Sequence, residues 1–218
     1  MTDYREELRT KILHTSLAEF HKRGIRAVRM DDIAGMLSIS KRTLYEIYSN
    51  KEELLVEGIR SEELAYNDSM KNFADDPQHN VIDIIIEFYN RNIKTLTNIN
   101  PVFFTEIDKY GRVVKLLGEL HGERQKSAKA FFNRGVGEGL FRADVDYDIV
   151  SRIGNASMDY VMQTRMYNEY NLRNILHNII FLFIRGICTE TGMRQIDEWT
   201  KIYESGCKEG QAFADAEH

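Results

Sequence analysis

Apolar residues recur at helical spacing along nearly the whole chain of 218 residues, and this pattern predicts an all-α protein. No run alternates apolar and polar residues as a half-buried strand would, and the hairpin dipeptides Asn-Gly and Asp-Gly do not occur. Both prolines, Pro77 and Pro101, fall between periodic segments. After residue 50 the pattern predicts helices over 51–72, 79–98, 101–108, 111–136, 146–166, 171–190 and 194–208.

Residues 28–53 predict two short helices joined by a tight turn, with a third helix opening at Lys51. Ile33 and Leu37 give the first helix an apolar face. Ser40 is a good N-cap for the second helix, because its hydroxyl can accept a hydrogen bond from a free backbone N–H. The spacing of these signals is typical of a helix-turn-helix.

The second helix of this pair has two distinct faces. Leu44, Ile47 and Tyr48 share one face and should pack inward. The residues left outside are mostly cationic or able to form hydrogen bonds: Lys41, Arg42, Thr43, Tyr45 and Glu46. A helix-turn-helix places such a helix in the major groove of DNA, so the segment predicts a DNA-binding head.

The third helix can begin with a capping box of Ser49 and Glu52, or one residue later with Asn50 and Glu53. In either case Lys51 lies in the first turn, where the helix dipole disfavours a cation. We therefore expect an anion beside Lys51, and a DNA phosphate is the candidate.

This segment resembles the DNA-binding region of the TetR (tetracycline-repressor-like) family of bacterial transcriptional regulators. The likeness covers about residues 5–60, where residues 5–25 are similar to the helix that precedes the pair. The matching positions are Ile33, Ala34, Ile39, Ser40, Lys41, Thr43, Leu44, Tyr45, Tyr48, Lys51, Glu52, Glu53 and Leu54.

The resemblance implies a homodimeric, ligand-responsive regulator, expected to be a repressor, that binds a palindromic DNA operator. By position, Lys41, Arg42 and Thr43 would reach the groove, while Tyr45 and Lys51 would hold phosphates. Tyr45 could also only cover the helix surface. A transcriptional activator of the same fold and a helical protein-binding adaptor are the alternative functions.

Three positions depart from the family pattern. Ser38 stands where Gly is usual, so the turn is either strained or of another type. Arg29 replaces a Ser or Thr cap and could instead reach a phosphate. Glu46 could accept from a cytosine amino group or repel phosphate.

Charge is divided unevenly along the chain. Residues 1–51 hold ten Lys and Arg against seven Asp and Glu, whereas residues 52–218 hold nineteen against twenty-seven. A mildly basic head on an acidic body favours site-specific DNA binding over general coating of nucleic acid. We expect a DNA-binding domain at 1–50 and a ligand-binding and dimerisation domain at 51–218.

The predicted helix 171–190 is apolar nearly all round, which requires burial on more than one side. A second subunit packed on this helix and on 146–166 would supply the other side, and the resemblance implies the same; a purely intrachain core is the alternative. The expected dimer residues are Ile153, Tyr160, Ile180, Phe183, Ile184 and Ile187.

Aromatic residues and methionines gather in the middle of the chain. They suit a cavity for an apolar or aromatic inducer, whose identity the sequence leaves open, and they equally suit an ordinary core. The expected pocket residues are Tyr89, Phe103, Phe104, Tyr110, Asn155, Met158, Met162 and Gln163.

Other chemistry finds no support in the sequence. The Gly-x-Gly at Gly135 follows a predicted helix and no strand, so we interpret it as a helix end and not as a dinucleotide loop. No catalytic motif, metal-ligand spacing or cofactor motif occurs, and we expect no enzyme activity. Two isolated cysteines, Cys188 and Cys207, and the lack of a membrane span or signal pattern favour the cytoplasm.

Overall fold

The computed structural model describes residues 2–215, and side chains for residues 4–120, 122, 128–201 and 203, which leaves the side chain of Cys207 outside the described part. The all-α fold is confirmed: these residues form helices and no strand, apart from one isolated bridge between Phe141 and Cys188. In chain order the helices are α1 (Thr2–Arg23), α2 (Met30–Met36), α3 (Lys41–Ile47), α4 (Lys51–Asp75), α5 (Val81–Thr97), α6 (Pro101–Ile107), α7 (Gly111–Gly137), α8 (Tyr147–Thr164), the 3-10 helix η1 (Met166–Asn168), α9 (Leu172–Ile187) and α10 (Glu190–Asp215).

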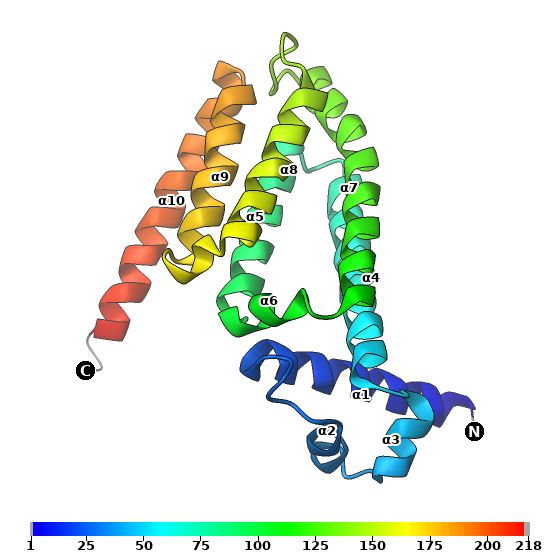
Figure 1. Cartoon of the computed structure of the whole chain (residues 1–218). Helices are drawn as coiled ribbons and strands as arrows, with labels where there is room; N and C mark the ends of the chain where they lie inside the picture. The colour runs from blue at the N-terminus through cyan, green and yellow to red at the C-terminus, as the bar shows by residue number, and fades with distance from the viewer. Residues whose placement is uncertain (1, 216–218) are drawn as a thin grey trace.

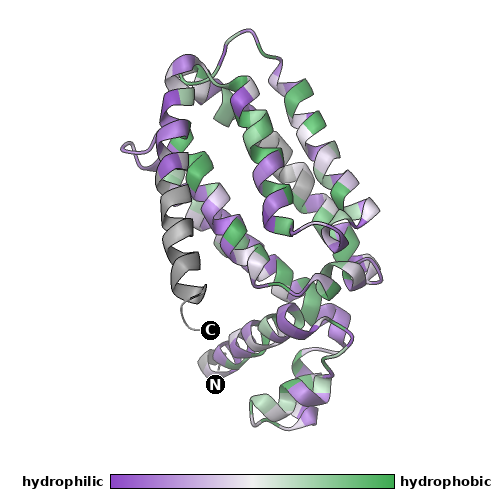
Figure 2. Cartoon of the chain, turned by 90° about the vertical axis from the view of Figure 1, so that its left-hand side faces the viewer, coloured by the Kyte–Doolittle hydropathy of each residue, from purple (hydrophilic) through white to green (hydrophobic). Residues whose placement is uncertain are grey.

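The first three helices form a head below a larger helical bundle (Figure 1). α4 rises from the head into the bundle and runs beside α7, while the short α6 lies across the top of the head. Along most helices hydrophobic and hydrophilic residues alternate, as expected for elements with one buried face (Figure 2). α4 and α6 are thus the elements that connect the head to the bundle.

The head does not have a core of its own. Its buried side chains, Ile12, Phe20 and Leu44 among them, join one cluster with Leu55 of α4 and Phe103 of α6. Because buried apolar contacts continue across the junction, a shift of α4 or α6 must be felt in the head. A second cluster fills the upper bundle between α5, α9 and α10.

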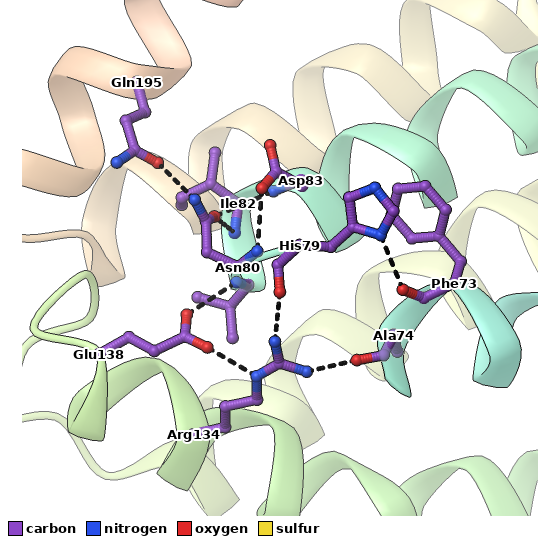
Figure 3. Close-up of polar contacts among 10 residues, drawn as sticks. Phe73, Ala74, His79, Asn80, Ile82, Asp83, Arg134, Glu138 and Gln195 are labelled. Carbon is purple, nitrogen blue, oxygen red and sulfur yellow. Dashed lines mark hydrogen bonds and ion pairs between the residues drawn. The ribbon is translucent and has the colours of Figure 1, made fainter. Parts of the chain in front are cut away.

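The end of the bundle opposite the head is fastened by Arg134 of α7 (Figure 3). Its guanidinium donates to the carbonyls of Ala74, at 2.6 Å, and of His79, and it pairs with Glu138 at 2.6 Å. Glu138 in turn accepts from the N–H of Val81 at 2.8 Å. One side chain therefore holds the α4–α5 connection against the end of α7.

The Gly-x-Gly segment is a helix end, as the sequence predicted. α7 stops at Gly137, and Gly139 adopts a left-handed φ of +71° that favours glycine. At Gly135 the ring of Phe141 packs so closely that a Cβ would lie 2.0 Å from it. The glycines serve a tight turn and a close approach, and not a phosphate loop.

The boundary between the last two helices differs from the prediction. α9 ends at Ile187, not at residue 190, and α10 runs over Glu190–Asp215 instead of 194–208. The carbonyl of Ile187 accepts from the N–H of Arg142, and Thr189 donates its N–H to Leu140. These long-range hydrogen bonds end the helix, and apolar periodicity gives no sign of them.

Candidate DNA interface and ligand cavity

The two helices of the head have the caps and the buried face that the sequence predicted. Ser40 is the N-cap of α3, and its hydroxyl accepts from the N–H of Thr43 at 3.0 Å. Leu44 and Tyr48 are fully buried and Ile47 is half-buried. Ser38 in the turn has a φ of +54°, the left-handed conformation that favours glycine.

The outer face of α3 presents its cations next to carboxylates. The Lys41 ammonium lies 2.5 Å from the carboxylate of Asp31, and the Arg42 guanidinium donates to Glu46 at 2.8 Å. These hydrogen bonds raise the pKa of both cations. Exposed pairs of this kind are weak, so DNA can compete for either cation. Tyr45 is half-exposed beside them.

Arg29 precedes α2 and is exposed. Its side chain makes no capping bond, but its own N–H donates to the carboxylate of Asp32 at 2.9 Å. Asp32 thus supplies a bond at the helix start where a Ser or Thr cap is missing, and the Arg29 guanidinium projects from the head surface.

Lys51 lies differently from what its position in the first turn suggested. α4 begins in the Asn50 register, and the half-buried Lys51 ammonium donates to the carbonyls of Ile25 at 2.8 Å and Val28 at 2.5 Å. Burial lowers its pKa. These carbonyls supply the negative partner that we had assigned to a DNA phosphate.

The loop that receives Lys51 is also held by α6. The N–H of Arg26 donates to the carboxylate of Glu106 at 2.8 Å. Gly24 opens the loop with a φ of +83°, and a Cβ there would lie 2.9 Å from Val102 of α6. Residues 24–29, which lead into the helix-turn-helix, are therefore bound by both elements that join the head to the bundle.

An apolar groove of about 720 Å³ runs between α8 and α9. Ile153 and Tyr160 of α8 line it and keep more than half of their surface exposed, and Leu182 continues the α9 side with 73% exposure. Large apolar side chains gathered in this way on a surface indicate a contact with another molecule.

The six expected dimer residues separate into two groups. Ile153 and Tyr160 lie on the open groove, and Ile180 and Phe183 are half-buried. Ile184 and Ile187 are buried against α5 and α10 within the same chain, because they lie on the opposite face of α9 from Leu182. We leave these two out of the interface that we propose.

A cavity of about 550 Å³ lies directly above the head. Six helices contribute to its wall, and the residues include aromatic rings, three amide or hydroxyl groups and two carboxylates. They are His21 of α1, Ile59, Glu62, Glu63 and Tyr66 of α4, Phe88, Asn92, Thr95 and Leu96 of α5, Ile99, Phe103, Phe104 and Ile107 at α6, Leu117 of α7 and Met162 of α8.

Of the expected pocket residues, Phe103, Phe104 and Met162 line this cavity. The other five lie elsewhere: Tyr89 is buried with its hydroxyl 2.9 Å from Nδ1 of His177, Tyr110 precedes α7, Met158 packs in the upper core, Asn155 is half-buried on α8 and Gln163 is exposed. Their polarity or ring type did not reveal which helix face they would occupy.

The sequence analysis did not identify the acidic side of the cavity, on α4, although the sequence contains a signal for it. Ile59, Glu62, Glu63 and Tyr66 are spaced i, i+3, i+4 and i+7 and share the inward face of the helix. Carboxylates at two of four inward positions break the usual amphipathic pattern. This exception to the pattern, together with the expectation that helix 51–72 forms a wall of the cavity, would have identified the two carboxylates.

The wall of the cavity brings a carboxylate of α4 close to a histidine of α1. Glu62 lies 4.0 Å from Nε2 of His21, but burial lowers the pKa of His21, so the imidazole is neutral near pH 7. Burial, with the neighbouring Glu63, raises the pKa of Glu62 to about 7. The ring of His21 also meets Phe103 edge-on, with centroids 4.7 Å apart.

Among the described side chains no group of three His, Cys, Asp or Glu residues is arranged to hold a metal ion. Cys188 is buried, and burial raises the pKa of its thiol to about 11, which disfavours the reactive thiolate. Within the same described part of the chain, no helix combines the length and the apolar character needed to span a bilayer.

In a comparison with known proteins, the head of the chain matches a family model. Residues 12–57 match the family model described as bacterial regulatory proteins, tetR family. No curated protein matches the chain.

Solved structures share the fold of almost the whole chain. A TetR-family transcriptional regulator from Agrobacterium tumefaciens is 11% identical, with a TM-score of 0.67 over 85% of this chain and 100% of that one. A protein from Saccharomonospora viridis, described as a transcriptional regulator in complex with choline, is 17% identical, with a TM-score of 0.68 over 85% and 100%. FadR from Bacillus subtilis, in complex with stearoyl-CoA, is 13% identical, with a TM-score of 0.60 over 82% and 98%.

Proposed function

We propose that this chain, a member of the TetR family of bacterial regulators, is a homodimeric transcriptional repressor that a small ligand releases from its operator. The carrying observation is α3: its N-cap and its buried Leu44 and Tyr48 fix the helix, so that Lys41, Arg42 and Tyr45 project from the head. That is the arrangement by which a recognition helix reads a major groove.

Roles on this face follow from the chemistry of each side chain. Arg42, with a guanidinium able to bind guanine in two places, is the proposed base contact, and Glu46 can accept from a cytosine amino group. Lys41 and Thr43 line the groove, and Tyr45 would contact a phosphate. Arg29, exposed at the start of α2, is placed to add a second phosphate contact, outside the groove.

The α8–α9 groove is the proposed dimer interface. A twofold axis through this face would pair Ile153, Tyr160 and Leu182 with a second copy and cover their exposed apolar surface. Two heads related by such an axis would enter successive major grooves about 34–36 Å apart, which requires a roughly palindromic operator.

The cavity is the proposed ligand site, and its position next to the head explains how a bound ligand could affect DNA binding. Its wall includes α4 and α6, and the same two helices bind the loop 24–29 through Lys51 and Glu106. A ligand that requires a different spacing of α4 and α6 would therefore move the head. Only a difference in affinity between the two arrangements drives release.

The test of DNA binding is fluorescence anisotropy with duplex DNA from upstream of the protein's own gene, at about 150 mM salt, because phosphate contacts depend on salt. We expect two subunits per site and binding that survives excess random DNA. Arg42→Ala should cost about 1–3 kcal/mol and relax preference at one base pair. Specific binding that is unchanged by Arg42→Ala would remove α3 from the reading of the operator.

The dimer is tested by light scattering after size-exclusion chromatography. Leu182→Glu should shift the protein towards the monomer, because it places a charge in an apolar contact. Leu64→Glu is the matched control, since Leu64 is an exposed leucine on α4, away from the groove. A Leu182→Glu protein that remains a dimer would exclude this face.

A further inference from the structure

The cavity above the head has a charge that suits one class of ligand. Its described lining includes the carboxylates of Glu62 and Glu63 and contains no Lys or Arg. The only other titratable groups among these residues are His21, which burial keeps neutral near pH 7, and the phenol of Tyr66. The described wall therefore carries no positive charge that would attract an anion.

Among the described side chains, the carboxylate of Glu62 forms one ion-pair contact, to His21, at the 4.0 Å limit of such a pair. Burial and Glu63 raise the pKa of Glu62 to about 7, so its negative charge is disfavoured at this position. A cation bound beside Glu62 would relieve that cost, whereas an anion would increase it.

Aromatic rings surround the same space from three helices. Tyr66 of α4, Phe88 of α5, and Phe103 and Phe104 of α6 all line it. The negative faces of such rings attract organic cations, most strongly where water is displaced. Apolar neighbours such as Leu96 would hold the rest of the molecule. The volume of about 550 Å³ lies within the range of sites that enclose drug-sized molecules.

We infer that the cavity binds a hydrophobic organic cation, an amine or a quaternary onium compound, with its charge beside Glu62 and its apolar body among the rings. This inference rests on the proposed function, since it names the ligand of the proposed inducer site. Because Glu62 lies 4.0 Å from His21, the bound charge would also lie close to the last turn of α1 in the head.

The experiment compares two probes of the same shape and opposite charge, tetraphenylphosphonium and tetraphenylborate, by isothermal titration calorimetry with the full-length protein at pH 7.5. We expect the cation to bind at one site per subunit and at least about tenfold more tightly than the anion. Equal affinity for the two probes, or preference for the borate, would overturn the inference.

Two variants locate the binding in this cavity. Glu62→Gln keeps the shape of the side chain and removes its charge. It should therefore lower the affinity for the phosphonium about tenfold and leave the affinity for the borate unchanged or higher. Glu198→Gln, at an exposed glutamate of α10, is the matched control and should change neither. If Glu62→Gln leaves phosphonium binding unchanged, the cation binds elsewhere and the inference is refuted.

A third variant tests the rings. Phe88 is 40% exposed, so Phe88→Leu should fold normally while removing one π face. It should lower the affinity for the phosphonium several-fold, because leucine keeps the apolar contact but lacks the attraction of an aromatic ring for a cation. An unchanged affinity would remove Phe88 from the proposed site.

Operator release is measured separately, by adding each probe to the protein–DNA complex. Release by the phosphonium alone would support both the inference and the proposed function. Tight phosphonium binding that depends on Glu62 without any release would uphold the ligand class and refute control of DNA binding by this cavity. The two ideas can therefore fail independently.

Discussion

Lys51 provides the sharpest test of how the head is fastened. Its ammonium donates to the carbonyls of Ile25 and Val28, and Lys51→Met keeps most of the aliphatic stem while deleting both hydrogen bonds. A hydrogen bond from a charged donor is worth about 1.5–3 kcal/mol, and we take less than this for each because the site is only half-buried. The expected loss is about 2 kcal/mol of unfolding free energy.

The assay is urea unfolding followed by circular dichroism at one fixed protein concentration, because dimerisation makes stability depend on concentration. Lys41→Met is the matched control, since Lys41 is an exposed lysine in an exposed ion pair and its loss should leave the urea unfolding curve nearly unchanged. In DNA binding, Lys51→Met should change the slope of log affinity against log salt by less than half a unit.

The reasoning would be refuted by the opposite pair of results. If Lys51→Met unfolds within about 0.5 kcal/mol of the unmodified protein and reduces the salt slope by about one unit, Lys51 is a phosphate contact and not a tie. The two roles therefore separate in two independent measurements on the same variant.

Three further changes test the packing, the turn and the cavity. Gly135→Ala should lose about 3 kcal/mol or more in urea unfolding, because its Cβ would meet the buried ring of Phe141, whereas Gly118→Ala, in open space on the same helix, should gain up to about 1 kcal/mol. Ser38→Gly should gain about 0.5–1 kcal/mol by the same assay, since glycine adopts its positive φ without strain. Glu62→Gln should be about 1 kcal/mol more stable than the unmodified protein at pH 8 and equal to it below pH 4.5. The reason is that a carboxyl pKa raised on folding from 4.5 to about 7 costs stability only at pH values where the carboxyl of the unfolded chain is ionised. The full shift would correspond to about 3 kcal/mol, and we take about a third of it because the side chain is 56% exposed. A stability difference that is constant with pH would contradict this account of Glu62.

The head was predictable in detail because its signals are local. Ser40 caps α3 through an N–H three residues away, and Leu44 and Tyr48 are buried by helical spacing alone. The unusual Ser38 was visible as a departure from the TetR pattern, and its left-handed φ is one of the two outcomes expected for it. Such features depend on a few neighbouring residues, which the sequence shows directly.

The side chains that act over long range could not be placed in the same way. Lys51 binds carbonyls more than twenty residues earlier in the chain, and Ile187 accepts from Arg142 across the bundle. Hydrophobic spacing identifies a buried face but not its neighbour, so Tyr89 was assigned to a cavity although it packs against His177. For these contacts the relative positions of the helices must be known first.

The same distinction explains how a ligand in the cavity would act on the head. His21 belongs to α1 by sequence, yet its ring lies in the cavity, where it faces Glu62 and Phe103. Its carbonyl accepts from the N–H of Asn100 at 2.7 Å, so the end of α1 is fixed to the start of α6. A ligand at Glu62 would therefore press on the head directly. Because packed interiors shift as units and do not deform continuously, a small displacement at this contact would be enough to re-aim α3, the proposed recognition helix.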